Sequence, residues 1–152
     1  MSIVRIGGKA PEFYTVLGPH VTDPEVIRKR CNLPITTKES MTWHVLKKRD
    51  GKVAAFVGEE PVHVPKKDLE NKDIPVEQRP LKQTKLQAFV VLEAGDDELL
   101  NFIGHVVDHF EKSPSPILTA SVLNEHAVLF RKARFKTINY KVNWTDLAII
   151  KK

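Results

Sequence analysis

The sequence has 152 residues, a hydrophobic content of 41% and a net charge of +5 at pH 7, which is the composition of one globular domain. Its apolar runs are far shorter than the roughly 20 residues of a membrane-spanning helix, and residues 1–8 lack the apolar core of a signal peptide. The single cysteine, Cys31, has no partner within the chain for a disulfide. These features exclude a membrane protein and a disulfide scaffold, and they predict a cytoplasmic location.

The charge is unevenly distributed along the chain. Residues 86–130 contain one lysine and seven acidic residues, whereas residues 131–152 contain seven basic residues and one acidic residue. The basic C-terminal segment predicts either contact with nucleic acid or another acidic partner, or lysines that protect the edge of a sheet from wrong pairing. The scarcity of aromatic residues between these charges favours the second interpretation.

The N-terminal third is predicted to contain one strand and short helices. Residues 1–9 predict a first strand, and residues 10–17 predict a short helix. Asp23-Pro24 is a typical helix start, with aspartate as the cap and proline at the first helical position. We expect Cys31, near the end of that helix, to pack as a small apolar residue.

A hairpin and a charged insert follow. The runs 42–47 and 52–57 alternate between apolar and polar residues on either side of Asp50-Gly51, and this arrangement predicts a β-hairpin. Residues 59–85 contain four prolines and twelve charged residues. They predict an insert with little regular structure, which is either a lid over one end of the sheet or a mobile segment.

The most regular pattern lies between residues 86 and 135. A run of β-branched and aromatic residues at 86–92 predicts a buried strand. Carboxylates followed by apolar residues at helical spacing predict a helix over 96–112. Residues 117–123 predict a second short strand, and residues 124–135 predict a second helix that Asn124 can cap. The order strand, helix, strand, helix predicts a compact α/β unit.

The segment 124–135 reads NEHAVLFRKARF and resembles the N-x-x-A-x-x-(Y/F)-x-K-x-G-F segment of the GNAT superfamily of N-acetyltransferases. The strand before it and the strand pair predicted after it, at 137–140 and 145–150, fit the end of that fold. By pattern the resemblance covers roughly the last 65 residues, and by element order the first half as well. It implies one mixed α+β domain over residues 1–152, with a central mixed sheet flanked by helices.

The resemblance also implies a function. GNAT proteins transfer an acyl group from acetyl-CoA or a related acyl-CoA to an amine on a small molecule or a protein. Backbone groups near the end of the central strand hold the pantetheine arm and polarise the thioester carbonyl. The residues at cofactor-side positions are Leu92, Gly95, Asn124 and Phe130. Glu93 is a candidate general base or, alternatively, a surface carboxylate at a strand end. Tyr140 is a candidate proton donor.

Three positions depart from the family pattern. The loop 93–98 has one glycine, four carboxylates and no basic residue, whereas the family has a glycine-rich loop that binds the pyrophosphate. Phe130 stands where the family often has a proton-donating tyrosine, and Arg134 stands where it has glycine. Three functions therefore remain open: an acyltransferase, a catalytically inactive binding protein of the same fold, and a GNAT-fold protein that acts on nucleic acid. Short, degenerate chains of this kind resemble bacteriophage proteins.

His105 and His109 have the spacing of two zinc ligands on one face of a helix. A catalytic zinc also needs a third protein ligand and an open position. His105 lies on the polar face of the predicted helix, with Glu98 and Asn101, which is typical of a solvated surface. The sequence therefore predicts no metal site.

Overall fold

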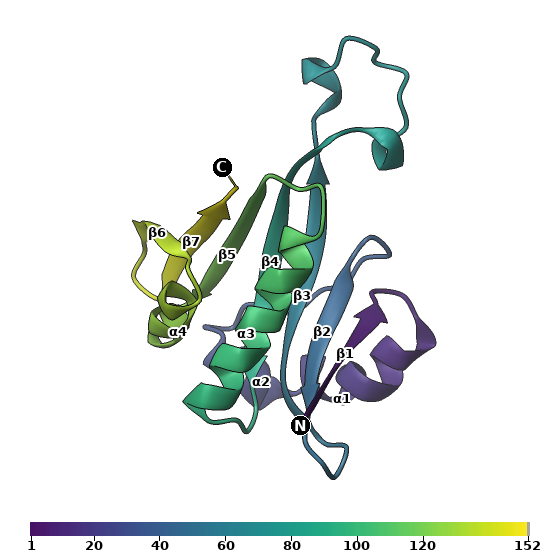
Figure 1. The fold of residues 1–152 in the computed structure, drawn as a ribbon. Helices are drawn as coiled ribbons and strands as arrows, with labels where there is room; N and C mark the ends of the chain where they lie inside the picture. The colour runs from purple at the N-terminus through teal and green to yellow at the C-terminus, as the bar shows by residue number, and fades with distance from the viewer. Residues whose placement is uncertain (152) are drawn as a thin grey trace.

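The computed structural model describes residues 1–151 and shows a seven-stranded mixed sheet in the order β1-β2-β3-β4-β5-β7-β6 (Figure 1). Lys152, the last residue of the predicted basic segment, lies outside the described residues. In this part of the chain, β4 and β5 are the one parallel pair of neighbours, and the other neighbours pair antiparallel. The predicted mixed α+β architecture is confirmed.

The strands are β1 Ser2–Gly7, β2 Thr42–Lys47, β3 Val53–His63, β4 Leu81–Val91, β5 Ile117–Leu123, β6 Lys136–Tyr140 and β7 Trp144–Ile150. The α-helices are α1 Gly18–Val21, α2 Pro24–Lys29, α3 Asp96–Glu111 and α4 Ala127–Lys132. A π-helical turn at Phe13–Leu17 precedes α1, and 3-10 turns lie at Lys66–Asp68, Val76–Gln78 and Asn124–His126.

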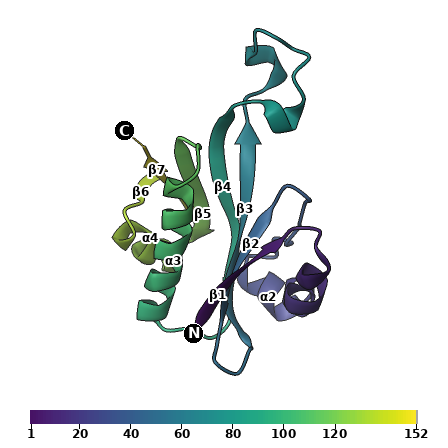
Figure 2. The ribbon, with the colours of Figure 1, turned by 45° about the vertical axis from the view of Figure 1, so that its right-hand side comes forward.

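Helices cover both faces of the sheet, with α1 and α2 on one face and α3 and α4 on the other (Figures 1 and 2). The apolar residues that predicted α3 are all buried: Leu99, Phe102, Ile103, Val106 and Phe110. Burial of each such side chain contributes about 1.5–3 kcal/mol to folding. A second core on the opposite face surrounds Trp43 and Phe56. None of the helices within residues 1–151 is long and apolar enough to cross a membrane.

The predicted β2–β3 hairpin is confirmed. Asp50 closes its turn, because the side-chain Oδ1 accepts the backbone N–H of Lys52 at 2.9 Å. Gly51 has φ of 86°, a left-handed conformation that glycine adopts without steric cost.

The charged insert is shorter than the sequence suggests. Strands β3 and β4 continue to His63 and Leu81, which pair with each other, so the ends of the predicted 59–85 segment are regular sheet. Residues 64–80 form the tip of this long hairpin and project beyond the body of the molecule (Figures 1 and 2). The tip lies at the end of β4 that is opposite to Leu92.

The end of α2 also differs from the prediction. Cys31 is exposed, and Cys31 and Asn32 have left-handed φ values of 57° and 63°. This turn reverses the chain after the helix. It places Arg30 in the interior, with only 6% of its surface exposed. The expectation that Cys31 packs as an apolar residue was therefore wrong.

Candidate functional site

Strands β4 and β5 lie side by side for only part of their length. Parallel pairing runs from Thr84 opposite Leu118 to Leu86 opposite Ala120. Beyond Leu86, β4 continues to its end paired with β3, and β5 continues to its end paired with β7. The two strands therefore part, and backbone polar groups face the gap between them.

A β-bulge in β4 lies where the strands part. Val90 pairs with Phe56 and Gln87 pairs with Gly58, so two residues of β4 oppose one residue of β3. Ala88 adopts a left-handed φ of 55°, which is costly for a residue other than glycine. A bulge bends its strand and increases the local twist. The bulge at Ala88 thus explains why β4 turns away from β5 here.

Two cavities of about 530 Å³ each border this gap. The strand-end cavity is lined by residues 89–91 of β4, Leu92 directly after it, Leu123 of β5 and His126, together with residues in and beside α2. The bulge cavity is lined by residues 85–88 of β4, Ser121 of β5 and Trp144 of β7, together with the segment after α2. Arg30 lines both cavities.

Arg30 is a buried cation beside the gap. Its guanidinium lies over the ring of Trp144, with Cζ 5.5 Å from the ring centroid, and its Nε donates to the carbonyl oxygen of Leu33 at 3.3 Å. Burial lowers the pKa of Arg30, although the guanidinium remains charged at neutral pH. No carboxylate among residues 1–151 forms a salt bridge with it.

The sequence predicted a role in the site neither for Arg30 nor for His126. The His126 side chain is 17% exposed, packs edge-to-face on Phe89 at 5.2 Å and lines the strand-end cavity. Burial lowers the pKa of His126, so the imidazole is neutral near pH 7 and can accept a proton. Its position two residues after Asn124, in the segment that resembles the family, was the one available signal.

The structure separates the four predicted cofactor-side residues. Leu92 lines the strand-end cavity, and its N–H donates to the carbonyl oxygen of Ala54 at 2.8 Å. The Gly95 N–H, at the start of α3, donates to Oε1 of Glu98 at 3.1 Å. Phe130 is 1% exposed and packs edge-to-face on the ring of Phe89, so it belongs to the core.

Asn124 connects two parts of the sheet instead of capping a helix. Its Oδ1 accepts the hydroxyl of Thr145 at 2.7 Å, and its Nδ2 donates to the carbonyl oxygen of Val142 at 2.9 Å. The side chain makes no capping hydrogen bond. The predicted cap is wrong, because the amide is used to hold the β6–β7 turn.

The two predicted catalytic residues lie outside both cavities. The Glu93 side chain is 79% exposed and pairs with Lys48 of the β2–β3 hairpin. Tyr140 is 67% exposed on β6, at the edge of the sheet, where its hydroxyl accepts a hydrogen bond from Arg131 at 3.4 Å. The structure therefore groups Leu92 with His126 and Arg30, and it leaves Glu93 and Tyr140 apart from them.

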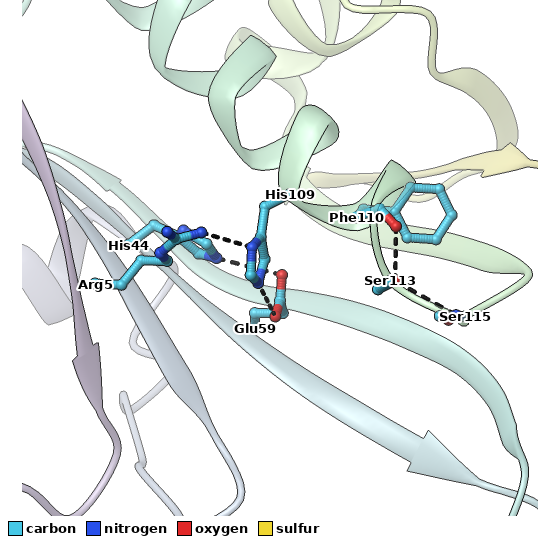
Figure 3. A network of polar contacts seen from close by, with 7 residues as sticks. All are labelled: Arg5, His44, Glu59, His109, Phe110, Ser113 and Ser115. Carbon is cyan, nitrogen blue, oxygen red and sulfur yellow. Dashed lines mark hydrogen bonds and ion pairs between the residues drawn. The ribbon is translucent and has the colours of Figure 1, made fainter.

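A second polar cluster lies on the opposite face of the sheet (Figure 3). Arg5 donates to Nδ1 of His109 at 2.6 Å, and Glu59 lies 3.5 Å from Nε2 of His109 and 3.3 Å from Nε2 of His44. Because arginine can only donate, His109 carries its proton on Nε2 and directs it at Glu59. In this arrangement Nε2 offers no lone pair to a metal ion, although the three side chains lie close enough to share one.

The basic C-terminal segment makes several contacts within the chain. Arg134 pairs with Glu111 at 2.6 Å, Lys141 pairs with Asp146 at 3.3 Å, and Lys151 donates to the carbonyl oxygen of Ser113 at 2.6 Å. These contacts give the charges a structural role. Contact of this segment with nucleic acid stays a prediction.

The fold matches solved structures although the sequence alone does not. No protein-family model matches the chain, and no curated protein matches it by sequence. An acyl-CoA N-acyltransferase from Pseudomonas aeruginosa is similar, with a TM-score of 0.67, 11% identity and 97% coverage of both chains. ElaA from Escherichia coli gives a TM-score of 0.62 at 9% identity, with 99% coverage of both chains.

A third match is the N-acetyltransferase PseH from Campylobacter jejuni in complex with acetyl coenzyme A. Its TM-score is 0.52 at 11% identity, over 99% of this chain and 100% of that chain. The chain therefore has the GNAT fold, and the resemblance seen in the sequence is confirmed at the level of the fold.

Proposed function

We propose that this chain transfers an acyl group from a CoA thioester to an amine at the gap between β4 and β5. The observation that carries the proposal is the parting of the two strands beyond Leu86 and Ala120, at the bulge of Ala88. The gap leaves backbone groups of β4 without a strand partner on the β5 side, so an extended thioester arm can lie there as an added strand. The acetyl coenzyme A bound to PseH, which has a similar fold, supports this donor.

The two ends of a CoA thioester fit this chain differently. The gap and the strand-end cavity suit the pantetheine arm. The start of α3 suits the pyrophosphate poorly, because Asp96, Asp97 and Glu98 form the first turn and Glu98 already accepts the Gly95 N–H. We therefore expect weak binding of CoA, with most of the affinity contributed by the arm.

The chemistry requires one proton to move. When the acyl carbon exchanges its bond to sulfur for a bond to nitrogen, the amine loses a proton and the thiolate gains one. The neutral His126 imidazole in the strand-end cavity can accept the proton of the amine and return it to the thiolate. Glu93 and Tyr140 stay weaker proposals for these roles, because their exposed side chains lie outside the cavities.

A binding protein without acyl-transfer activity is the second candidate function. Phe130, at the position of the family's tyrosine, is buried in the core and has no proton to donate. The acidic first turn of α3, where Glu98 satisfies the Gly95 N–H, also favours this candidate. It predicts that the chain binds neither CoA nor its thioesters.

Calorimetric titration separates the two candidates. We expect heat of binding and a thermal shift with acetyl-CoA, and also with S-acetylpantetheine, which has the arm but lacks the pyrophosphate and the nucleoside. Release of free thiol in the presence of amines then measures transfer. The absence of heat and of a thermal shift with both thioesters at millimolar concentration would remove the acyltransferase and leave the binding protein.

A further inference from the structure

The bulge cavity has a positively charged wall. Three basic residues line it, Arg30, Lys85 and Lys141, and none of its described lining residues is acidic. Lys141 is partly neutralised, because it lies 3.3 Å from Asp146. Arg30 and Lys85 have no salt-bridge partner within residues 1–151. The cavity therefore keeps an excess of positive charge.

A nearby carboxylate does not neutralise this excess. Glu60 lies on β3 opposite Lys85, but its side chain accepts hydrogen bonds from Lys38 at 2.9 Å and from Gln87. Its charge is thus already matched by Lys38. An anion that enters the bulge cavity meets Arg30 and Lys85 without competition from a bound carboxylate.

Arg30 has unused hydrogen-bonding capacity beside the cavity. Its Nε–H is bonded to the Leu33 carbonyl, which leaves the four N–H groups on Nη1 and Nη2 without a partner within residues 1–151. In the described part of the chain, every fully buried side-chain nitrogen or oxygen has a partner. The two terminal nitrogens are therefore not fully buried, and Arg30 lines both cavities, although the residue as a whole is only 6% exposed.

We propose that the bulge cavity binds the anionic group of the acceptor amine, a carboxylate or another oxyanion, on the guanidinium of Arg30. This proposal rests on the proposed acyl transfer, since it names the class of acceptor for the same gap. The planar guanidinium matches a carboxylate with two parallel hydrogen bonds. Arg30 also borders the strand-end cavity, so an acceptor held there directs its amine toward His126.

The geometry also predicts which amines are rejected. A polyamine places a second cation against Arg30 and Lys85, where like charges repel. An amine with only a hydroxyl group leaves the guanidinium without a counter-ion. Both classes are therefore poor ligands of the bulge cavity, whereas an amino acid is a good one; the carboxylates Asp23, Glu25 and Glu125 line only the strand-end cavity, where the amine would lie.

The test uses the full chain and four small amines that differ in the second group. Glycine and leucine carry a carboxylate, 2-aminoethylphosphonate carries a phosphonate, and putrescine carries a second amine. Binding is measured by saturation-transfer NMR without any acyl donor, and transfer is measured by thiol release from acetyl-CoA. We expect the anionic amines to bind and putrescine not to bind, and the preferred anion identifies a carboxylate or a phosphorus oxyanion as the recognised group.

Variants assign the binding to the cavity. Arg30→Gln removes the charge at similar length, and we expect it to weaken binding of the preferred anion by about tenfold or more. Lys85→Gln, at an exposed position, should weaken it less. Arg28→Gln is the matched control, because Arg28 is exposed on the same helix and pairs with Glu25 at 2.7 Å. Circular dichroism checks that each variant folds. If Arg30→Gln does not fold, binding is measured instead with Arg30→Lys, which keeps the charge but not the planar guanidinium.

Each outcome is decisive for one of the two proposals. Two results would overturn the anion site and keep the acyl transfer. The first is equal binding of anionic amines to the wild type and to both cavity variants. The second is no binding of any anion at 10 mM while acetyl-CoA is consumed with other amines. Binding that depends on Arg30, in a chain that neither binds nor consumes a thioester, would support the anion site and remove the acyl transfer.

Discussion

The two faces of the sheet hold buried charge in different ways. On the α3 face, Arg5, His109, Glu59 and His44 form a connected network in which each side chain meets a partner (Figure 3). On the α2 face, Arg30 is buried whereas Arg5 is exposed, yet no carboxylate among the described residues pairs with Arg30.

This difference separates groups that serve the fold from groups that serve a ligand. Burial of a polar group costs free energy unless the protein supplies a partner, and the network on the α3 face meets that requirement. Arg30 meets it only in part, through the Leu33 carbonyl and the Trp144 ring, so the fold gains little from keeping a charge at this position. The gap and the cavities beside Arg30 offer another reason for the charge, which is the binding of a ligand.

The largest effect that we expect concerns activity in the strand-end cavity. His126→Gln removes the imidazole at similar size, so thiol release from acetyl-CoA with an acceptor amine should fall by about 100-fold, as is usual for loss of a general acid–base group. The melting temperature should change little. His105→Gln is the matched control, because His105 is exposed on α3. Equal losses in both variants, or none in His126→Gln, would remove His126 from the chemistry.

The α3 face should show the opposite response. Glu59→Ala takes the shared acceptor away from His44 and His109 and leaves the buried His44 without its partner. We expect the free energy of unfolding in urea to fall by about 2 kcal/mol, the usual contribution of hydrogen bonds to a charged group. The affinity for the acyl donor should stay at the wild-type value. An unchanged stability would mean that the network is not structural.

The start of α3 offers a gain of function. Asp96→Asn together with Asp97→Asn removes two negative charges from the place where a pyrophosphate would bind. At about 6 Å in water two such charges contribute roughly 1.4 kcal/mol, so CoA should bind about tenfold more tightly. Binding of S-acetylpantetheine, which lacks the pyrophosphate, serves as the internal control and should not change. An equal gain for both ligands would contradict the electrostatic explanation.

The stability of an Arg30 variant tests whether this residue serves a ligand rather than the fold. Arg30→Met replaces an uncompensated buried cation with an apolar side chain of similar length. Because replacement of buried charge by apolar groups is often neutral or stabilising, we expect a change within about 1 kcal/mol of the wild type, or a gain. Urea unfolding measures it. A loss as large as that of Glu59→Ala would show that Arg30 serves the fold.

The elements that could be predicted from the sequence are those whose signal is local. The apolar period of α3 and the Asp50-Gly51 turn depend on neighbours in sequence, and both were predicted correctly. The bulge gave no such signal, because Ala88 occupies a left-handed position that usually calls for glycine.

The site could not be predicted because its members come from distant parts of the chain. Arg30 follows α2 and His126 precedes α4, and they meet only because the fold places both beside the gap. His109 was compared with His105, its neighbour on the helix, whereas its partners lie on β1 and β3. A periodicity argument considers one element at a time, so contacts across the sheet remain invisible to it.

The smallest expected effect is a dependence of stability on pH to which His109 and His126 both contribute. Burial lowers the pKa of His109 and of His126 in the folded chain. For His109, the Glu59 carboxylate opposes this shift, and His44 and Arg5 add to it. In the unfolded chain both histidines regain their ordinary pKa of about 6.5. As pH falls below that value, the unfolded state takes up protons first, so the free energy of unfolding decreases, whereas above it these groups contribute no slope.

Urea unfolding between pH 7.5 and pH 5.5 measures this dependence in the wild type and in two variants. His109→Gln and His126→Gln should each show a smaller loss of stability on acidification, because each removes one group that must be protonated in the unfolded chain. Burial lowers both pKa values against nearby carboxylates, Glu59 at His109 and Glu125 and Asp96 at His126, so we expect a reduction of slope from each variant. A wild type that becomes more stable toward pH 5.5 would mean that the Glu59 carboxylate outweighs burial. The contact between His109 and Glu59 would then be an ion pair rather than a hydrogen bond from a neutral imidazole.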